Sequence, residues 1–192
     1  MPLVPVLLAL LAASPAAPEA APCSVDVEAP EVELGPAGAP IEVTGFLDPA
    51  SPQSWRAFLE LRRLVADHDG EVRLELLLTG RGGPRDPHAD RVRAFVASLA
   101  TQGHLETTLR VVARDDVERV HARLVDPQAH PALAAELGVP VARVRAALRD
   151  RCARLRVDAR TDALLDVLGL ESGGMARMPA FVVAGLTFDD GP

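Results

Sequence analysis

Two serine hydroxyls lie at the start of a predicted helix, in the motif Ser51-Pro52-Gln53-Ser54. The N-terminal end of a helix favours an anion, but its partial charge cannot bring a hydroxyl near ionisation at neutral pH. The motif contains no His, Asp or Lys that could act as a general base. Asp48, just upstream, could orient Ser51, although an acid at such a place more often closes a turn. These four residues therefore do not by themselves predict a serine nucleophile.

Cys23 and Cys152 are the only two cysteines, and they lie too far apart in the chain to form a Cys-x-x-Cys redox centre. Cys152 falls on the apolar stripe of a predicted helix, as a buried free thiol often does. In an oxidising compartment the pair could instead form a structural disulfide that tethers the N-terminal segment to the helical part of the chain. The residues alone leave both alternatives open.

Composition and spacing exclude two kinds of ligand. The chain has 192 residues, of which 48% are apolar, and its net charge at pH 7 is −7. All 20 basic residues are Arg, and no local run of them offers the basic stripe that nucleic acid requires. The five His residues show no pairing at helical spacing, so we expect no bound metal.

The N-terminal residues 1–20 are predicted to be a cleaved secretory signal peptide. An apolar run over residues 3–13 is too short to span a bilayer, and small residues and prolines follow it. Residues 21–40 form an acidic lead-in rich in Pro, and we expect the ordered domain to begin at Ile41. Since no later stretch is apolar for long enough to cross a membrane, the sequence predicts a periplasmic or secreted protein without a membrane span.

A strand, a helix and a second strand are predicted at the start of a single α/β domain over residues 41–192. Alternating apolar residues indicate strands over residues 41–47 and 71–78. Residues 54–67 between them indicate a helix, with Ser51 as its N-cap and Pro52 in its first turn. These elements would place the serine motif directly after a strand.

The rest of the domain is predicted to be a helical layer followed by a hairpin. Helical periodicity runs through residues 81–160, including one stripe from Val141 to Leu155, and residues 161–168 indicate a further helix. A strand over residues 180–184 and a return at residues 186–188 follow Met178-Pro179.

This order of elements resembles the thioredoxin-fold oxidoreductases of the DsbA type, and three segments carry the likeness. Residues 35–55 (GPAGAPIEVTGFLDPASPQSW) resemble the segment that leads into that family's Cys-x-x-Cys helix start. Residues 87–105 resemble its first inserted helix, and residues 177–191 (RMPAFVVAGLTFDDG) resemble its Thr-Pro-x-Phe-x-x-x-Gly segment. The resemblance implies a thioredoxin-like fold with a helical insertion, and a cis Pro179 that faces the active site.

Serine stands at both cysteine positions of the active-site motif that the resemblance implies. Disulfide exchange needs one thiolate to attack sulfur and a second thiol to resolve the mixed disulfide, and serine can do neither. We therefore expect no oxidoreductase activity, no catalytic residue and no cofactor. In the family the backbone beside the cis proline pairs with an extended substrate. The resemblance thus implies a peptide or protein partner at Met178 and Pro179, with Trp55 as a further contact.

An enzymatic alternative comes from a second likeness. The run Ser51-Pro52-Gln53-Ser54-Trp55 also resembles the helix start of kappa-class glutathione transferases and the related chromene-carboxylate isomerases. In those enzymes the first serine donates a hydrogen bond to the glutathione thiolate. The likeness implies that Ser51 would take this role, with glutathione as cofactor.

The end of the chain raises an expectation about assembly. Thioredoxin-type domains usually continue with a helix that covers one sheet face, whereas here the sequence stops shortly after the predicted hairpin. An apolar face left open would be a binding site. We therefore expect the lead-in, a partner chain or a second copy in a homo-oligomer to cover it, or else the sequence to be truncated.

Overall fold

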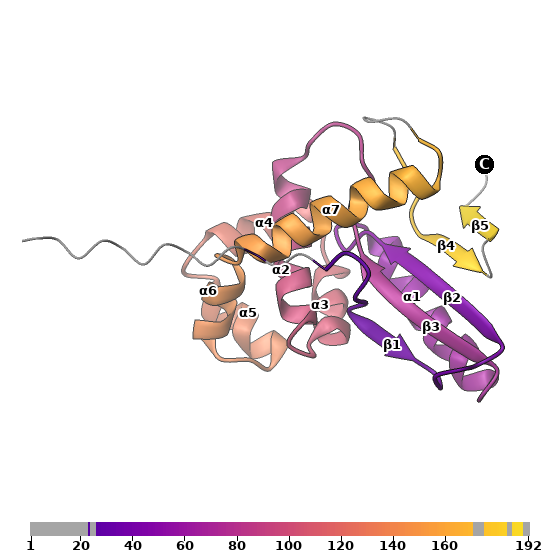
Figure 1. Ribbon diagram of the computed structural model, residues 1–192. Helices are drawn as coiled ribbons and strands as arrows, with labels where there is room; N and C mark the ends of the chain where they lie inside the picture. The colour runs from indigo at the N-terminus through magenta and orange to yellow at the C-terminus, as the bar shows by residue number, and fades with distance from the viewer. Residues whose placement is uncertain (1–22, 24–25, 171–174, 184–185, 190–192) are drawn as a thin grey trace, which may run out of the picture.

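The structure, a computed structural model, describes residues 23, 26–170, 175–183 and 186–189 (Figure 1). The predicted signal peptide therefore lies outside the described residues. Within this part of the chain, no helix is both long and apolar enough to cross a membrane.

A five-stranded mixed sheet forms the centre of the fold, in the order β1-β3-β2-β4-β5. The parallel pair β2 and β3 lies in the middle, with Val43 opposite Leu74 and Leu47 opposite Leu78, and every other pairing is antiparallel. The strands are β1 (Val32–Leu34), β2 (Ile41–Leu47), β3 (Val72–Leu78), β4 (Ala180–Val183) and β5 (Leu186–Asp189).

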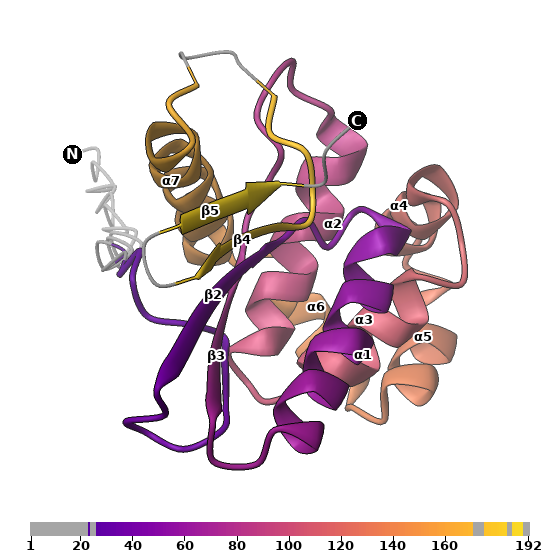
Figure 2. The ribbon, with the colours of Figure 1, turned by 90° about the vertical axis from the view of Figure 1, so that its right-hand side faces the viewer.

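Helix α1 (Pro52–Asp67) connects β2 to β3 and covers one face of the sheet, as the sequence predicts. Because successive side chains of β3 point to opposite faces of the sheet, Val72, Leu74, Leu76 and Leu78 share one face. They lie in a core that also contains Phe58 of α1. Figure 2 shows α1 on one side of the sheet and α7 (Arg151–Val167) on the other. The predicted strand, helix and strand unit is thus confirmed.

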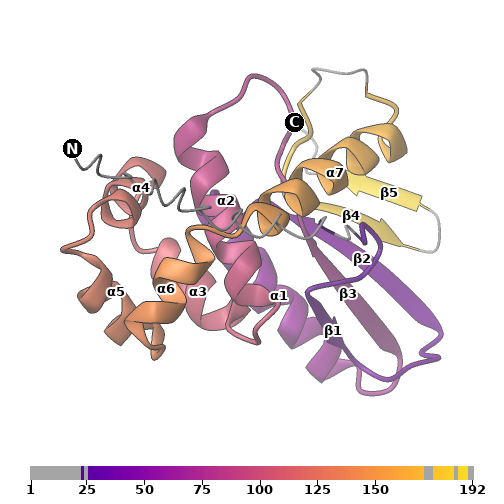
Figure 3. The ribbon, with the colours of Figure 1, turned by 60° about the vertical axis from the view of Figure 1, so that its left-hand side comes forward.

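The helical layer differs from the prediction at its ends. It begins at Pro87 rather than Arg81, and α7 is one continuous helix, so the separate helix predicted over residues 161–168 is wrong. The predicted stripe from Val141 to Leu155 is split between two helices, because the Asp150 side chain accepts a hydrogen bond from the Ala153 N–H and starts α7 (3.0 Å). At one end of the sheet (Figure 3) lie α2 (Pro87–Ala100), α3 (Leu105–Val112), α4 (Val117–Val125), α5 (His130–Leu137) and α6 (Val141–Ala147).

The lead-in belongs to the fold, so the predicted domain start at Ile41 is wrong. Its short strand β1 pairs with β3, with Val32 opposite Leu76. The Glu31 carboxylate accepts a hydrogen bond from the Leu78 N–H (2.9 Å) and pairs with the buried guanidinium of Arg160. These contacts hold the lead-in along α7 and the β3 edge of the sheet.

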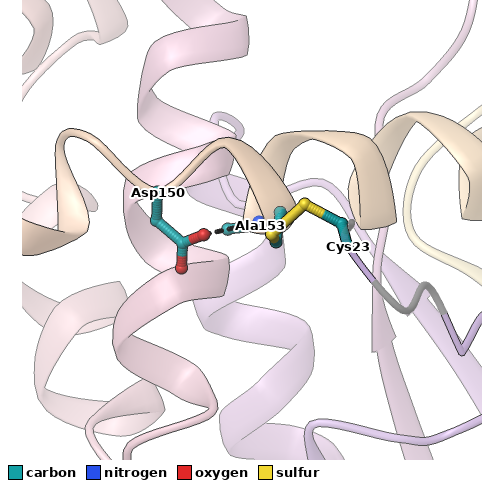
Figure 4. Close-up of a disulfide and its surroundings, with 4 residues drawn as sticks. Cys23, Asp150 and Ala153 are labelled. Atoms are coloured by element: carbon teal, nitrogen blue, oxygen red, sulfur yellow. Dashed lines mark hydrogen bonds between the residues drawn. A yellow bond between two sulfur atoms is a disulfide. The ribbon is translucent and has the colours of Figure 1, made fainter. Parts of the chain in front are cut away.

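A disulfide joins the lead-in to the helical layer. Cys23 is bonded to Cys152 near the N-terminal end of α7, as Figure 4 shows. Of the two alternatives that the sequence left open, the structure therefore contains the disulfide and not a buried free thiol.

The parts of the sheet that no helix covers differ in polarity between its two faces. On the α7 side, Phe46 and Leu77 pack with Leu164. Towards the β1 edge that face is polar, where Arg73 forms ion pairs with Glu33 (3.3 Å), Glu42 (3.6 Å) and Glu75 (2.8 Å). On the α1 side, the flank over β4 is apolar and lies far from the lead-in, which runs along the opposite edge. The described part of the lead-in, Cys23 and residues 26–40, therefore does not cover the apolar opening, which leaves the other occupants expected above.

Candidate functional site

The N-terminal end of α1 presents Ser51 where the sequence predicts it. Ser51 has extended backbone angles at the N-cap position, and Pro52 opens the helix. Its N–H donates to the Asp48 carbonyl (2.9 Å), while its hydroxyl donates to the side-chain oxygen of Gln53 rather than capping a helix N–H. The hydroxyl is thus half-exposed at the helix start, without a basic side chain as its hydrogen-bond partner.

Ser54 is buried and has a structural role. Its side chain is inaccessible, and its hydroxyl donates to the carbonyl oxygen of Asp48. This contact ties the first turn of α1 to the end of β2. A buried hydroxyl that already donates to a backbone carbonyl is not placed to react with a ligand.

The carboxylate of Asp48 is paired with Arg93 and not with the Ser51 hydroxyl. Its carboxylate, 1% exposed, accepts hydrogen bonds from Nε and Nη2 of Arg93 on α2, at 2.9 and 2.8 Å, and from the N–H of Ala50 at 3.0 Å. Burial alone would lower the pKa of Arg93, but the hydrogen bonds and charges of Asp48 and Asp90 raise it above its ordinary value. Of the two roles weighed for Asp48, the structure shows the turn acid.

Sequence reasoning missed Arg93. It lies 45 residues from Asp48 in the chain, and its neighbours on α2 read as an ordinary apolar stripe. The signal that could have found it is a strand-end acid without a local partner, together with one arginine beside the buried stripe of a following helix.

Met178 and Pro179 lie just beyond the end of the β2–β4 ladder. The register of these strands ends at the pair Phe46 and Ala180, and the Met178–Pro179 peptide bond is cis, as the resemblance implies. Met178 is half-buried with its side chain in the α7-side cluster that contains Leu165. The paired part of the sheet therefore does not use the backbone groups of Met178.

A groove of about 540 Å³ separates α1 from β4. One wall is the stripe of α1 at helical spacing that ends at Leu64, 40% exposed, and the other is Pro179 and Phe181. Its floor is mainly apolar and its rim carries opposite charges. This α1–β4 groove is lined by Gln53, Arg56, Ala57, Glu60, Leu61, Leu64, Pro179 and Phe181.

Trp55 does not belong to this groove. It lies on another flank of α1, stacks on Phe58 with ring centroids 6.0 Å apart, and packs against the main core. Of the three residues expected to contact a peptide, the structure brings Pro179 into the groove, places Met178 beside it and puts Trp55 elsewhere.

Ser51 faces a second, polar cavity of about 330 Å³ on the α2 side of the helix start. Its charged lining consists of Asp48, Arg81, Asp86 and Arg93. The disulfide joins Cys23 of the lead-in to Cys152 of α7, and neither sulfur lines this cavity or the α1–β4 groove. Among the described residues, no group of three or more His, Cys, Asp or Glu side chains is arranged to hold a metal ion.

Solved structures are similar to this chain, although no protein-family model and no curated protein matches it. A thioredoxin-like oxidoreductase from Silicibacter pomeroyi DSS-3 aligns with a TM-score of 0.58 and 22% identity, over 85% of this chain and 86% of that one. DsbA from Chlamydia trachomatis aligns with a TM-score of 0.61 and 16% identity, over 91% of each chain. A putative protein-disulfide isomerase from Pseudomonas syringae aligns with a TM-score of 0.55 and 20% identity, over 83% of this chain and 89% of that one.

Identities this low establish the fold and not the chemistry. The chain has the DsbA-like thioredoxin fold, an α/β architecture whose central sheet carries a helical insertion.

Proposed function

We propose that this protein binds an extended peptide, or an extended segment of a partner protein, in the α1–β4 groove without exchanging disulfides. The observation that carries the proposal is the groove itself: an apolar channel that starts beside the first turn of α1 and runs past Pro179. At that helix start, where the family resemblance implies two thiols, the chain presents hydroxyls instead.

The hydroxyls support a non-catalytic role. Exchange requires a thiolate, which a helix N-terminus can stabilise on sulfur but not on a serine oxygen. Ser51 bonds to Gln53 and Ser54 bonds to the Asp48 carbonyl, so neither is activated by a base. The chain's only two cysteines, Cys23 of the lead-in and Cys152 of α7, are bonded to each other. The described site thus offers shape and hydrogen-bonding groups, but no free thiol.

The geometry suits binding by strand addition. An extended segment beside Met178 could pair with backbone groups that lie beyond the β2–β4 ladder, while its alternate side chains enter the groove. Leu61 and Leu64 would contribute apolar contact, at about 25 cal/mol per Å² of buried apolar area. Arg56 and Glu60 on the rim would accept a partner of mixed charge.

Export to the periplasm or the cell exterior is part of the proposal. The apolar run over residues 3–13 is typical of a secretory signal. The Cys23–Cys152 disulfide supports the same conclusion, because such bonds persist in oxidising compartments and are rare in the cytosol.

Reduction of insulin by dithiothreitol, followed by turbidity, tests the absence of exchange. We expect the wild-type protein to leave the uncatalysed rate unchanged. The double variant Ser51→Cys/Ser54→Cys should accelerate the reaction, because the N-terminus of α1 would stabilise a thiolate at position 51.

Two results would count against the proposal. Acceleration by the wild-type protein would overturn the non-catalytic role. An inert double variant that still folds would show that residues 51 and 54 are not at the positions of a disulfide-exchange site.

A further inference from the structure

A second groove, of about 440 Å³, lies between α2 and the junction of α6 with α7. It is separate from the α1–β4 groove and shares no residue with it. Ala94, Ala147 and Leu148 contribute apolar atoms to its lining. Five arginines also line it, and we call it the arginine groove. They are Arg85, Arg91, Arg149, Arg151 and Arg154.

The charge of this groove is opposite to that of the protein. The chain has a net charge of −7, yet the groove is lined by five arginines and only two acids, Asp90 and Asp150. Both acids are already engaged: Asp90 accepts from Arg93 (2.9 Å), and Asp150 caps α7. The positive charge of the groove is therefore poorly neutralised by its own lining.

The arginines themselves have few partners in the described part of the chain. Arg91 and Arg151 are exposed and form no hydrogen bond or ion pair with the described residues. Arg154 reaches Asp90 and Asp158 only at 3.9 Å, and Arg85 reaches Asp158 at the same distance. Guanidinium groups at such distances keep most of their donors free for a ligand.

We infer that the arginine groove binds a phosphate group. A guanidinium offers paired N–H donors that match phosphate oxygens, and several around one hollow can surround a dianion. The volume of the groove suits a compact group, and its apolar floor suits a ligand whose phosphate is joined to an apolar part. A free phosphorylated small molecule and the headgroup of an anionic phospholipid share this chemistry.

Two binding measurements on the purified protein distinguish the sources. Isothermal titration with inorganic pyrophosphate at constant ionic strength probes a free phosphate ligand. Co-sedimentation with vesicles of phosphatidylglycerol and phosphatidylcholine, against vesicles of phosphatidylcholine alone, probes a lipid headgroup. We expect saturable binding in at least one of them.

A matched pair of variants tests the place of binding. Arg91→Gln/Arg151→Gln removes two charges from the groove, while Arg63→Gln/Arg114→Gln removes two exposed charges that lie outside it. The first variant should weaken binding at least about tenfold. The second should bind as the wild type does.

Each result decides the inference. Pyrophosphate binding lost only in the first variant assigns a free phosphate ligand, and vesicle binding lost only in that variant assigns the phospholipid headgroup. Absence of binding in both measurements, or equal loss in both variants, would overturn the inference.

Discussion

The guanidinium of Arg93 holds the buried carboxylate of Asp48 through two hydrogen bonds, from Nε at 2.9 Å and from Nη2 at 2.8 Å. The pair joins the end of β2 to α2, and the Asp48 carbonyl accepts a hydrogen bond from Ser54 in the first turn of α1. It therefore links the helical insertion to the loop that carries Ser51. Because Asp48 also accepts from the Ala50 N–H, this carboxylate sets the shape of that loop.

Removal of Arg93 should destabilise the fold strongly. Arg93→Met leaves the Asp48 carboxylate buried without its partner, which should lower the free energy of unfolding by about 3–5 kcal/mol in urea denaturation. The control is Arg119→Met, which breaks an exposed pair with Asp115 and should cost less than about 1 kcal/mol. Equal, small losses in the two variants would contradict the role assigned to Arg93.

Loss of the disulfide should weaken the fold without abolishing it. Cys23→Ser/Cys152→Ser should lower the free energy of unfolding by about 2–4 kcal/mol, because the unfolded chain is no longer cross-linked. The lead-in should stay docked, since Arg160 still binds the carbonyls of Val27 and Ala29 and the carboxylate of Glu31. Wild-type protein in reductant provides the matched measurement and should unfold at the same urea concentration as the double variant. An unchanged midpoint in both would refute this prediction.

The imidazole of His121, which stacks on that of His88, should make stability depend on pH. Their ring centroids are 4.3 Å apart. Burial lowers the pKa of His121, the charges of His88 and Arg91 lower it further, and Asp86 acts in the opposite direction. The unfolded chain therefore takes up this proton first, so the contribution is complete above the unfolded pKa of about 6.5 and is lost as the pH falls below it.

His121→Gln should reduce the loss of stability between about pH 7.5 and pH 5.5, measured as the shift in urea midpoint. His104→Gln removes a histidine outside the stacked pair and should leave the wild-type shift in place. Identical shifts in all three proteins would show that protonation of His121 does not oppose folding.

The sequence predicted the elements around the serine motif because their signals are local. Alternation along β2 and β3 and the Ser51-Pro52 helix start need no distant partner to be recognised. Strand β1 was missed because it has only three residues. Its formation depends on pairing with β3 and on the contact between Glu31 and Arg160. Such contacts join residues far apart in the chain and leave no spacing signal.

The start of α7 at Arg151 was missed for a related reason. A stripe of apolar residues from Val141 onward suggests one helix, and only the capping contact of Asp150 with the Ala153 N–H shows where a new helix begins. An open apolar sheet face was expected, but the residues that line the α1–β4 groove were beyond prediction. Leu64 is an ordinary apolar helix residue in the sequence, and its exposure beside Phe181 follows from how the sheet and α1 are placed.

Binding of an unfolded chain without free thiols tests the central proposal most directly. Reduced and carboxymethylated α-lactalbumin is a suitable probe, because its blocked sulfurs cannot exchange. We predict saturable binding by the wild-type protein, weakened at least about tenfold by Leu64→Arg, which places a charge in the groove. Leu59→Arg is the matched control, since Leu59 is a similarly exposed leucine of α1 (36%, against 40% for Leu64) outside the groove, and should bind as the wild type does. Absence of wild-type binding, or equal weakening by the two variants, would contradict the account.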